Sequence, residues 1–387
     1  MKRLIMTLAF VALCVFTTSA QKTIPQVTTL ARTAKANRTE IILPQVKGYT
    51  CYKGDFHVHT TYSDGKVSPA GRVMEAWLDG LDIVAITDHY EHHLGVKNVI
   101  KSISMTDSTV INYRAAKVSH NKIHEEAVAQ LEKSGFPMLL VKGGEITRNA
   151  ETIGHFNMLF LQDIDAAFDA DPAEAFRKAK AQGGIVIHNH PAYRRKTCDK
   201  TEFHQQVYAE GLVDGVEVVN GTGFYPPIVR RCIDEGLTMF ANTDEHHLTE
   251  RRYGAVDRFR TMTLVLASEL TEASIKEAIL DHRTIAFAGG AWIGEQMWLS
   301  EFLNAAVDCR LVKTAEEGRT FRLTNNSSVA MTLRLGHRIY LLEPFKSLLI
   351  ELGRNKESGE YLPPIFEVEN MWHIDYQHPK IELALDE

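Results

Sequence analysis

The stretch "GDFHVHTTYSDG", residues 54–65, places two histidines one residue apart, ahead of a polar turn that ends in glycine. In an extended strand, alternate side chains lie on one face about 7 Å apart, so His57 and His59 can point into one cavity. A strand end that carries two histidines by coincidence is the simpler interpretation, because short motifs often match by chance. The rest of the chain has to decide between the two.

Histidine is concentrated in one part of the chain. The 387 residues contain 17 histidines, and 13 of them fall between His57 and His247. The composition is otherwise typical of a globular protein, with 44% apolar and 24% charged residues. The clustering therefore calls for a local explanation.

The first twenty residues have the pattern of a secretory signal peptide. Lys2 and Arg3 precede an apolar run over residues 4–16, and Ser19 and Ala20 supply small residues at a cleavage point. We expect an exported protein, periplasmic or secreted, with no membrane span after cleavage. Residues 21–50 are expected to form a leader segment before the first strand.

Charge and cysteine usage narrow the possible partners. The formal net charge is −6 with no concentrated basic stripe, so we expect no duplex nucleic acid partner. The cysteines after the signal peptide do not form a CxxC pair, which argues against a thiolate zinc site. The sequence does not predict the oligomeric state.

Short apolar runs alternate with amphipathic stretches through most of the chain. The runs lie at 81–89, 138–147, 155–161, 183–191, 215–221, 237–247 and 283–290, and the helical stretches at 68–80, 113–135, 171–184, 226–236 and 271–283. This alternation indicates parallel βα units, hence an α/β barrel or an open sheet, which we place at residues 51–300. Shorter alternating strands follow, and they predict a C-terminal β-sandwich over residues 305–387.

Histidine, aspartate and glutamate recur at the ends of the predicted strands. They are His57 and His59, Asp88 and His89, Glu145, His155, His188 and His190, and Asp244 and His246. In parallel α/β barrels the carboxyl ends of all strands face one mouth, where the chemistry takes place. Imidazole and carboxylate ligands without thiolate suit Zn, Mn or Fe. Paired cations roughly 3.5–4 Å apart can activate water against a phosphoryl or carbonyl group.

The ordered set HxHTxxSDG, TDH, GxE, GH, HP and TDxH, from Asp55 to Gly290, resembles the polymerase and histidinol phosphatase (PHP) superfamily of metal-dependent phosphoesterases. The resemblance implies a distorted (β/α)7 TIM-like barrel that holds two or three divalent metal ions. It implies nine ligands: His57, His59 and Asp244 for a first ion; His155 and His190 for a second, with Glu145 bridging; and Asp64, His89 and His246 for a third. Some relatives carry a histidine near Asp64, whereas this chain has Ser63, Asp64 and Gly65, so the resemblance leaves open whether two or three ions bind. Asp88 is expected to orient a neighbouring ligand.

Other polar residues near the predicted mouth have less specific signals. Arg194, Arg195 and Arg148 are candidates to hold a phosphate, because a guanidinium matches phosphate oxygens, although each could equally be an ordinary surface arginine. His188 is either a positioning residue or a hydrogen-bonded core histidine. His92, His93 and His247 are candidates for a general acid or for simple lining of the mouth.

These features predict an exported metal-dependent hydrolase that cleaves a small phosphorylated substrate, a monoester or a diester, with Glu145, Arg194 and Arg195 in catalytic roles. One alternative is an amidase or carboxylester hydrolase, since the same chemistry can attack a carbonyl group. The other is a binding module in which metals only stabilise the barrel.

Overall fold

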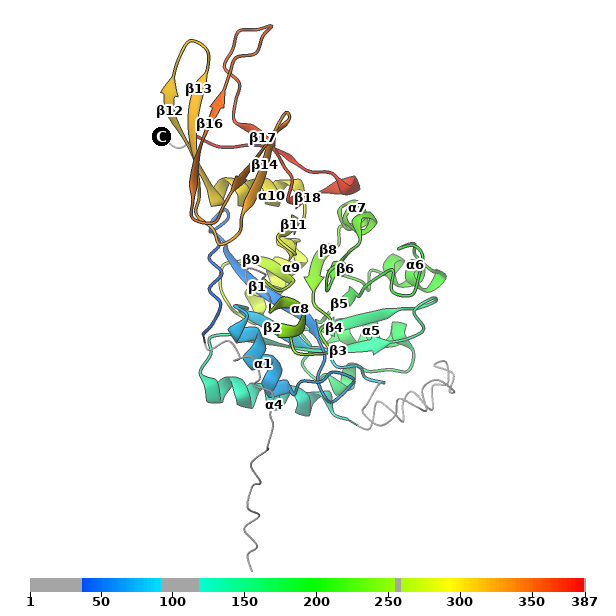
Figure 1. The fold of residues 1–387 in the computed structure, drawn as a ribbon. Coiled ribbons are helices and arrows are strands. Elements are labelled where there is room, and N and C mark those ends of the chain that lie inside the picture. The colour runs from blue at the N-terminus through cyan, green and yellow to red at the C-terminus, as the bar shows by residue number, and fades with distance from the viewer. Residues whose placement is uncertain (1–36, 92–117, 255–258, 386–387) are drawn as a thin grey trace, which may run out of the picture. The chain divides into compact units, whose positions relative to one another are not determined.

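The computed structural model describes residues 37–91, 118–254 and 259–385 (Figure 1). The predicted signal peptide, residues 21–36 of the predicted leader, and His92 and His93 lie outside these described residues. Among the helices of the described part, none is both long and apolar enough to cross a membrane.

One large sheet contains twelve strands. They are β1 (Thr50–Val58), β2 (Ile83–Ile86), β3 (Leu139–Thr147), β4 (His155–Leu159), β5 (Ile185–His188), β6 (Gly215–Asn220), β7 (Gly223–Phe224), β8 (Thr238–Asn242), β9 (Met262–Ala267), β10 (Thr284–Ala288), β11 (Ala291–Ile293) and β18 (Met371–Trp372). Neighbouring strands follow the order β18-β11-β10-β9-β1-β2-β3-β4-β5-β6-β7, and β8 pairs with β6. The mixed α/β architecture is the predicted class, while the count of seven βα units stays a prediction.

Several of the helices that accompany this sheet begin at a capping side chain or end at glycine. The helices are α1 (Pro69–Leu78), α4 (His120–Ser134), α5 (Pro172–Ala181), α6 (Glu202–Ala209), α7 (Pro226–Glu235), α8 (Glu250–Tyr253), α9 (Glu272–Leu280) and α10 (Gln296–Ala306), with 3₁₀ turns η1 (Asp165–Ala167) and η2 (Ile374–Tyr376). The Ser68 side chain accepts a hydrogen bond from the Gly71 amide at the start of α1. Gly135, with φ 66°, ends α4 in the left-handed conformation that glycine tolerates.

Strand β4 corrects the expectation of purely parallel βα units. It runs antiparallel to both β3 and β5, with Thr147 opposite His155 and Phe156 opposite His188. Only residues 148–154 connect β3 to β4, and a parallel crossover needs a dozen residues or more. The reversal brings the first residue of β4, His155, to the edge where β3 and β5 end.

Strand β9, which the sequence did not predict, runs antiparallel to β1 and β10. Strand β8 lies against β1 and β9 through side chains. Thr263 Oγ1 accepts a hydrogen bond from the Ala241 amide at 2.9 Å, and Asn242 Oδ1 accepts one from the Phe56 amide at 2.9 Å. Just after the end of β8, the Asp244 amide donates a hydrogen bond to the His57 carbonyl at 2.8 Å. The ends of β1 and β8 therefore meet, which places their histidines and aspartate side by side.

Two smaller antiparallel sheets follow α10. The first contains β12 (Val307–Thr314), β13 (Arg319–Asn325) and β16 (Ser347–Leu352), and the second contains β14 (Met331–Leu335), β15 (Arg338–Leu342), β17 (Ile365–Val368) and β19 (Lys380–Glu382). Their packing as a sandwich, and the boundary at residue 305, stay predictions.

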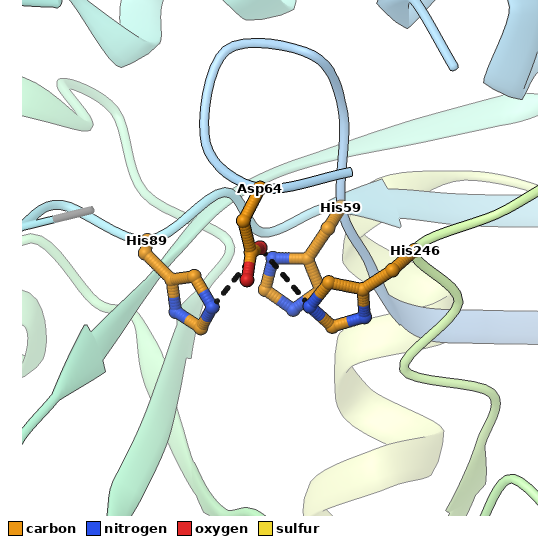
Figure 2. A group of neighbouring side chains, drawn as sticks. All are labelled: His59, Asp64, His89 and His246. Atoms are coloured by element: carbon orange, nitrogen blue, oxygen red, sulfur yellow. Dashed lines mark ion pairs between the residues drawn. The ribbon is translucent and has the colours of Figure 1, made fainter. Parts of the chain in front are cut away.

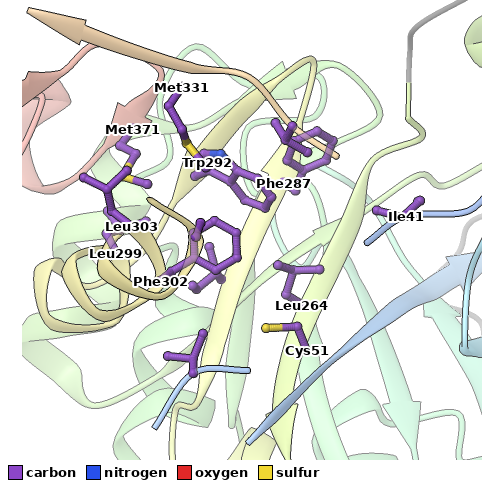
Figure 3. Close-up of a cluster of buried hydrophobic side chains, with 14 of the residues drawn as sticks. Ile41, Cys51, Leu264, Phe287, Trp292, Leu299, Phe302, Leu303, Met331 and Met371 are labelled. Atoms are coloured by element: carbon purple, nitrogen blue, oxygen red, sulfur yellow. The ribbon is translucent and has the colours of Figure 1, made fainter. Parts of the chain in front are cut away.

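A hydrophobic cluster links these small sheets to the large one (Figure 3). Trp292 of β11 is fully buried, and its ring centroid lies 4.6 Å from that of Phe287 and 4.5 Å from that of Phe302. Met331 and Met371, from the C-terminal part of the chain, belong to the same cluster. Burying this much apolar surface stabilises the large sheet at its β11 end, away from the strand ends that carry histidines.

Candidate metal centre

Eight of the nine predicted ligands fall into three groups whose ligand atoms lie within 4.8 Å of one another. The groups are His57, His59 and Asp244; His57, Glu145 and His190; and His59, Asp64, His89 and His246. The ninth, His155, lies beside the second group, with Nδ1 3.4 Å from Glu145 Oε1. Residues from seven separate places in the sequence thus converge at one edge of the sheet.

Glu145 lies between the groups and is fully buried in β3. Its Oε1 is 3.5 Å from His57 Nε2 and 3.7 Å from His190 Nε2. Its Oε2 is 3.6 Å from His59 Nε2 and 2.5 Å from His89 Nδ1. Because the two oxygens face different histidines, this carboxylate has the geometry of a bridge between two cations.

Asp244 completes the group formed with the first two histidines. Its Oδ1 lies 3.3 Å from His57 Nε2 and 3.0 Å from His59 Nε2. Asp244 has φ 52° and His190 has φ 25°, which are strained values for residues other than glycine. Strain of this kind is concentrated at functional sites, where the surrounding structure holds it in place.

The third group surrounds Asp64 (Figure 2). Asp64 Oδ1 lies 3.0 Å from His246 Nε2 and 3.4 Å from His89 Nε2, and the ring of His246 stacks on that of His59 at 4.2 Å. The next residue has to be glycine, because a Cβ at Gly65 would lie 2.5 Å from the His59 carbonyl oxygen. The SDG turn therefore folds back tightly enough to return Asp64 to the strand end.

The donors of these groups fit divalent cations. Asp64 Oδ1 and Glu145 Oε2 are buried, and imidazole nitrogens face both of these oxygens. Burial opposes ionisation of Glu145, but His89 and His57 hold its pKa well below the usual range. Burial lowers the pKa of His59 to about 4, with help from His246 and His89, so this imidazole keeps a lone pair to donate. Nitrogen and oxygen donors of this kind suit Zn, Mn or Fe.

Glu217 is a site residue that the sequence analysis missed. It is fully buried in β6, and its Oε1 lies 2.8 Å from His57 Nδ1. Its Oε2 accepts hydrogen bonds from the His190 amide at 2.7 Å and from Asn220 at 2.9 Å. A carboxylate behind a ligating histidine fixes the ring and its tautomer, leaving Nε2 for the metal. The sequence feature that could have revealed Glu217 is a charged residue inside the apolar run "GVEVVN", residues 215–220.

Arg72 of α1 is a second residue that the sequence did not reveal. Its guanidinium, 2% exposed, donates to the carbonyl oxygens of His59 at 2.8 Å, Glu245 at 2.7 Å and His247 at 2.7 Å. It also pairs with Glu75 at 2.7 Å. One buried side chain therefore ties together the two segments that carry His59 and His246.

The predicted arginines lie in different surroundings. Arg148 is buried and pairs with Glu91, and it also donates to backbone carbonyls, so it is not an ordinary surface arginine, and its role toward phosphate stays a prediction. The guanidinium of Arg195 donates to the carbonyls of Pro191 and Asp199. Arg194 is exposed. The catalytic roles of Arg194 and Arg195 stay predictions.

Three further predicted residues lie beside the ligand groups. His188 stacks on Phe156 and its Nδ1 lies 2.9 Å from the Tyr208 hydroxyl, as expected of a hydrogen-bonded core histidine. Asp88 accepts hydrogen bonds from the Thr60 amide at 2.7 Å and from Ser63 at 2.5 Å, so it holds the turn after His59. His247 Nδ1 lies 3.0 Å from Arg251.

Comparison with solved structures identifies the family. A two-domain protein from Bacteroides vulgatus ATCC 8482, which contains a predicted PHP-like metal-dependent phosphoesterase, shares 32% sequence identity with this chain. The match covers 90% of this chain and 99% of that one, with a TM-score of 0.78. The chain belongs to the PHP-like family of metal-dependent phosphoesterases. The PHP resemblance predicted from the motifs is therefore confirmed.

More distant structures match this PHP-like chain as well. A metal-dependent phosphoesterase from Bifidobacterium adolescentis is 17% identical, with 60% of this chain and 97% of that chain covered and a TM-score of 0.37. Endonuclease Q, in complex with a 27-mer duplex that carries an abasic lesion, is 13% identical, with 64% and 60% covered and a TM-score of 0.39. Neither the protein-family models nor the curated proteins gave a match.

The Endonuclease Q complex corrects one expectation. We expected no duplex nucleic acid partner from the acidic net charge, and that exclusion was wrong. Net charge sums the whole surface, whereas binding depends on the local potential, to which metal ions at a site contribute.

Proposed function

We propose that this protein hydrolyses phosphate esters of a small substrate with divalent ions: one at His57, His59 and Asp244, one at His155 and His190 with Glu145, and one at Asp64, His89 and His246. The observation that carries the proposal is the position of Glu145, whose two oxygens face separate sets of histidines. Divalent ions at these groups would supply Lewis acidity toward the phosphoryl oxygens and would activate water. We also propose that the protein acts after export, as the pattern of residues 1–20 predicts.

The position of each residue in the site suggests its role. Glu145 holds the ligand groups at a fixed separation from a position near the carboxyl end of β3. Glu217 fixes the ring of His57, and Arg72 fixes the backbone of His59, so these ligands need little rearrangement when ions bind. Arg194 is the exposed cation that we assign to substrate oxygen atoms, because the guanidinium of Arg195 is committed to backbone carbonyls.

Hydrolysis of p-nitrophenyl phosphate and bis-p-nitrophenyl phosphate tests the proposal. Protein stripped with a chelator is reloaded separately with Zn, Mn or Fe, and Glu145→Gln is assayed beside it. We expect reloading to restore turnover, and the variant to lose it about 100-fold or more, since its amide cannot bridge two cations. The preferred ester distinguishes a diesterase from a phosphatase.

A matched control separates loss of the site from general damage. His190→Asn removes a predicted ligand, whereas His124→Asn removes a half-buried histidine of α4 outside the ligand groups. We expect loss of turnover in the first variant only. Absence of turnover of either ester by fully metal-loaded protein would refute the phosphoesterase proposal.

A further inference from the structure

The segment between β5 and α6, residues 189–201, carries an exposed aromatic side chain next to the second ligand group. The Tyr193 side chain is 43% exposed, and its ring centroid lies 5.1 Å from that of His190 and 5.6 Å from that of His155. An exposed tyrosine presents a flat apolar face and a polar hydroxyl, which together suit contact with a ligand ring. The hydrolytic chemistry proposed above does not require this ring.

Hydrogen bonds within this segment hold the backbone that carries the ring. The Tyr193 amide donates to the His190 carbonyl at 2.8 Å, and the Arg195 amide donates to the Ala192 carbonyl at 2.9 Å. The guanidinium of Arg195 donates to the carbonyls of Pro191 and Asp199, on either side of the turn. A backbone held in this way loses little conformational entropy when a ligand covers the ring.

The ring also forms part of a pocket wall. That pocket is lined by Gly154, His155, His188, His190, Tyr193 and Arg195, among other residues. It therefore opens directly beside two predicted ligands of the second ion. A group attached to a phosphoryl centre held at His155 and His190 would lie near the ring, because the ring is adjacent to both histidines.

A planar group already lies over this ring. The guanidinium carbon of Arg194 is 5.1 Å from the Tyr193 ring centroid, and both side chains are exposed. The ring face thus accepts a flat partner, and an exposed arginine can move aside or cover the outer face of that partner.

We propose that Tyr193 is a specificity-determining residue, which stacks against a planar aromatic or heterocyclic group of the phosphate ester. This inference rests on the proposed phosphoesterase function and names its substrate class: esters of aryl or nucleoside-type alcohols rather than of aliphatic ones. Stacking distinguishes these classes, because a saturated ring of similar size lacks a flat face to oppose the tyrosine.

Binding of two phosphonates to the metal-loaded protein tests the inference. Benzylphosphonate and cyclohexylmethylphosphonate share the phosphonate and differ in the flat ring, and calorimetry measures each Kd without turnover. We expect the parent protein to bind benzylphosphonate about fivefold more tightly. Tyr193→Ala should abolish this preference while cyclohexylmethylphosphonate stays within about twofold of the parent Kd, and Tyr193→Phe should keep the preference.

Phe345→Ala is the control, because Phe345 is an exposed aromatic residue between β15 and β16, and it should keep the parent values. Equal binding of the two phosphonates by the parent protein, or an unchanged preference in Tyr193→Ala, would overturn the inference and leave the phosphoesterase proposal intact. Failure of the parent protein to bind either phosphonate, together with no ester turnover, would overturn both.

Discussion

Oε1 of Glu217 lies 2.8 Å from Nδ1 of His57, and both side chains are fully buried. The same carboxylate accepts a hydrogen bond from the backbone amide of His190. One residue on β6 therefore orients ligands from the ends of β1 and β5, two strands that are not neighbours in the sheet. We therefore expect metal affinity to depend on Glu217, although Glu217 is not one of the ligands.

Replacement of Glu217 should weaken metal binding without removing a ligand. In Glu217→Ala the ring of His57 loses its acceptor, and we expect the metal affinity to fall about 10- to 100-fold. Competition with a chromophoric chelator measures the loss. Glu217→Gln keeps an oxygen for His57 but cannot accept two further hydrogen bonds, so its loss should be smaller. Parent affinity in Glu217→Ala would contradict this prediction.

Replacement of Arg72 should destabilise the fold. Arg72→Met leaves the carboxylate of Glu75 and three backbone carbonyls without their buried partner, and we expect a loss of about 3–5 kcal/mol in the free energy of unfolding. Urea denaturation of the metal-free protein measures it. The matched control is Arg177→Met, which breaks an exposed pair with Glu210 and should stay within about 0.5 kcal/mol of the parent. Similar values for the two variants would show that Arg72 is not a structural clamp.

Asp64 should determine whether a third ion binds. Asp64→Asn removes the carboxylate that faces His89 and His246, while the other two groups keep all their ligands. We expect elemental analysis to find one ion fewer per chain than in the parent protein. Asp163→Asn, at an exposed aspartate, should keep the parent metal content. Equal metal content in Asp64→Asn and the parent would mean that this group holds no ion.

Stability should fall as the pH drops below neutral, in part because of His204. Burial lowers the pKa of His204 to about 4, whereas an unfolded histidine titrates near 6.5. Between these values the unfolded chain binds a proton that the folded chain does not. The contribution of His204 to stability is therefore complete above pH 6.5 and declines as the pH falls toward 4.

His204→Gln should remove this contribution. We expect a shallower dependence of the unfolding free energy on pH between 7 and 4.5 than in the parent protein, measured by urea denaturation. His337→Gln, which removes an exposed imidazole, should keep the parent slope. A parent slope in His204→Gln would rule out His204 as a contributor.

The sequence singled out residues that the structure brings together, because the position of each one is set by local rules. His57 and His59 share a face through the two-residue period of a strand, and Gly65 marks the tight turn that returns Asp64. Asp244 and His246 follow an apolar run, where the end of a buried strand is expected. Each of these patterns can be recognised within a few residues, and the order of the motifs along the chain indicated the family.

The sequence revealed strand β4 itself, whereas its direction became clear only from the tertiary structure. Its apolar run, beginning at His155, was recognised from the sequence. Its reversal follows from the short connection over residues 148–154, but the alternation with helices suggested a parallel strand. The pattern of apolar residues is the same in both directions, so it cannot fix the direction by itself.

By itself, the sequence determined which residue types gather at the strand ends, because strand period, turn glycines and motif order are local properties of the chain. Only the tertiary structure decided that β8 closes against β1, that Glu217 lies behind His57, and that Arg148 is buried while Arg194 is exposed. These relationships join residues distant in sequence, and their free energy comes from hydrogen bonds and burial that exist only after the strands have packed.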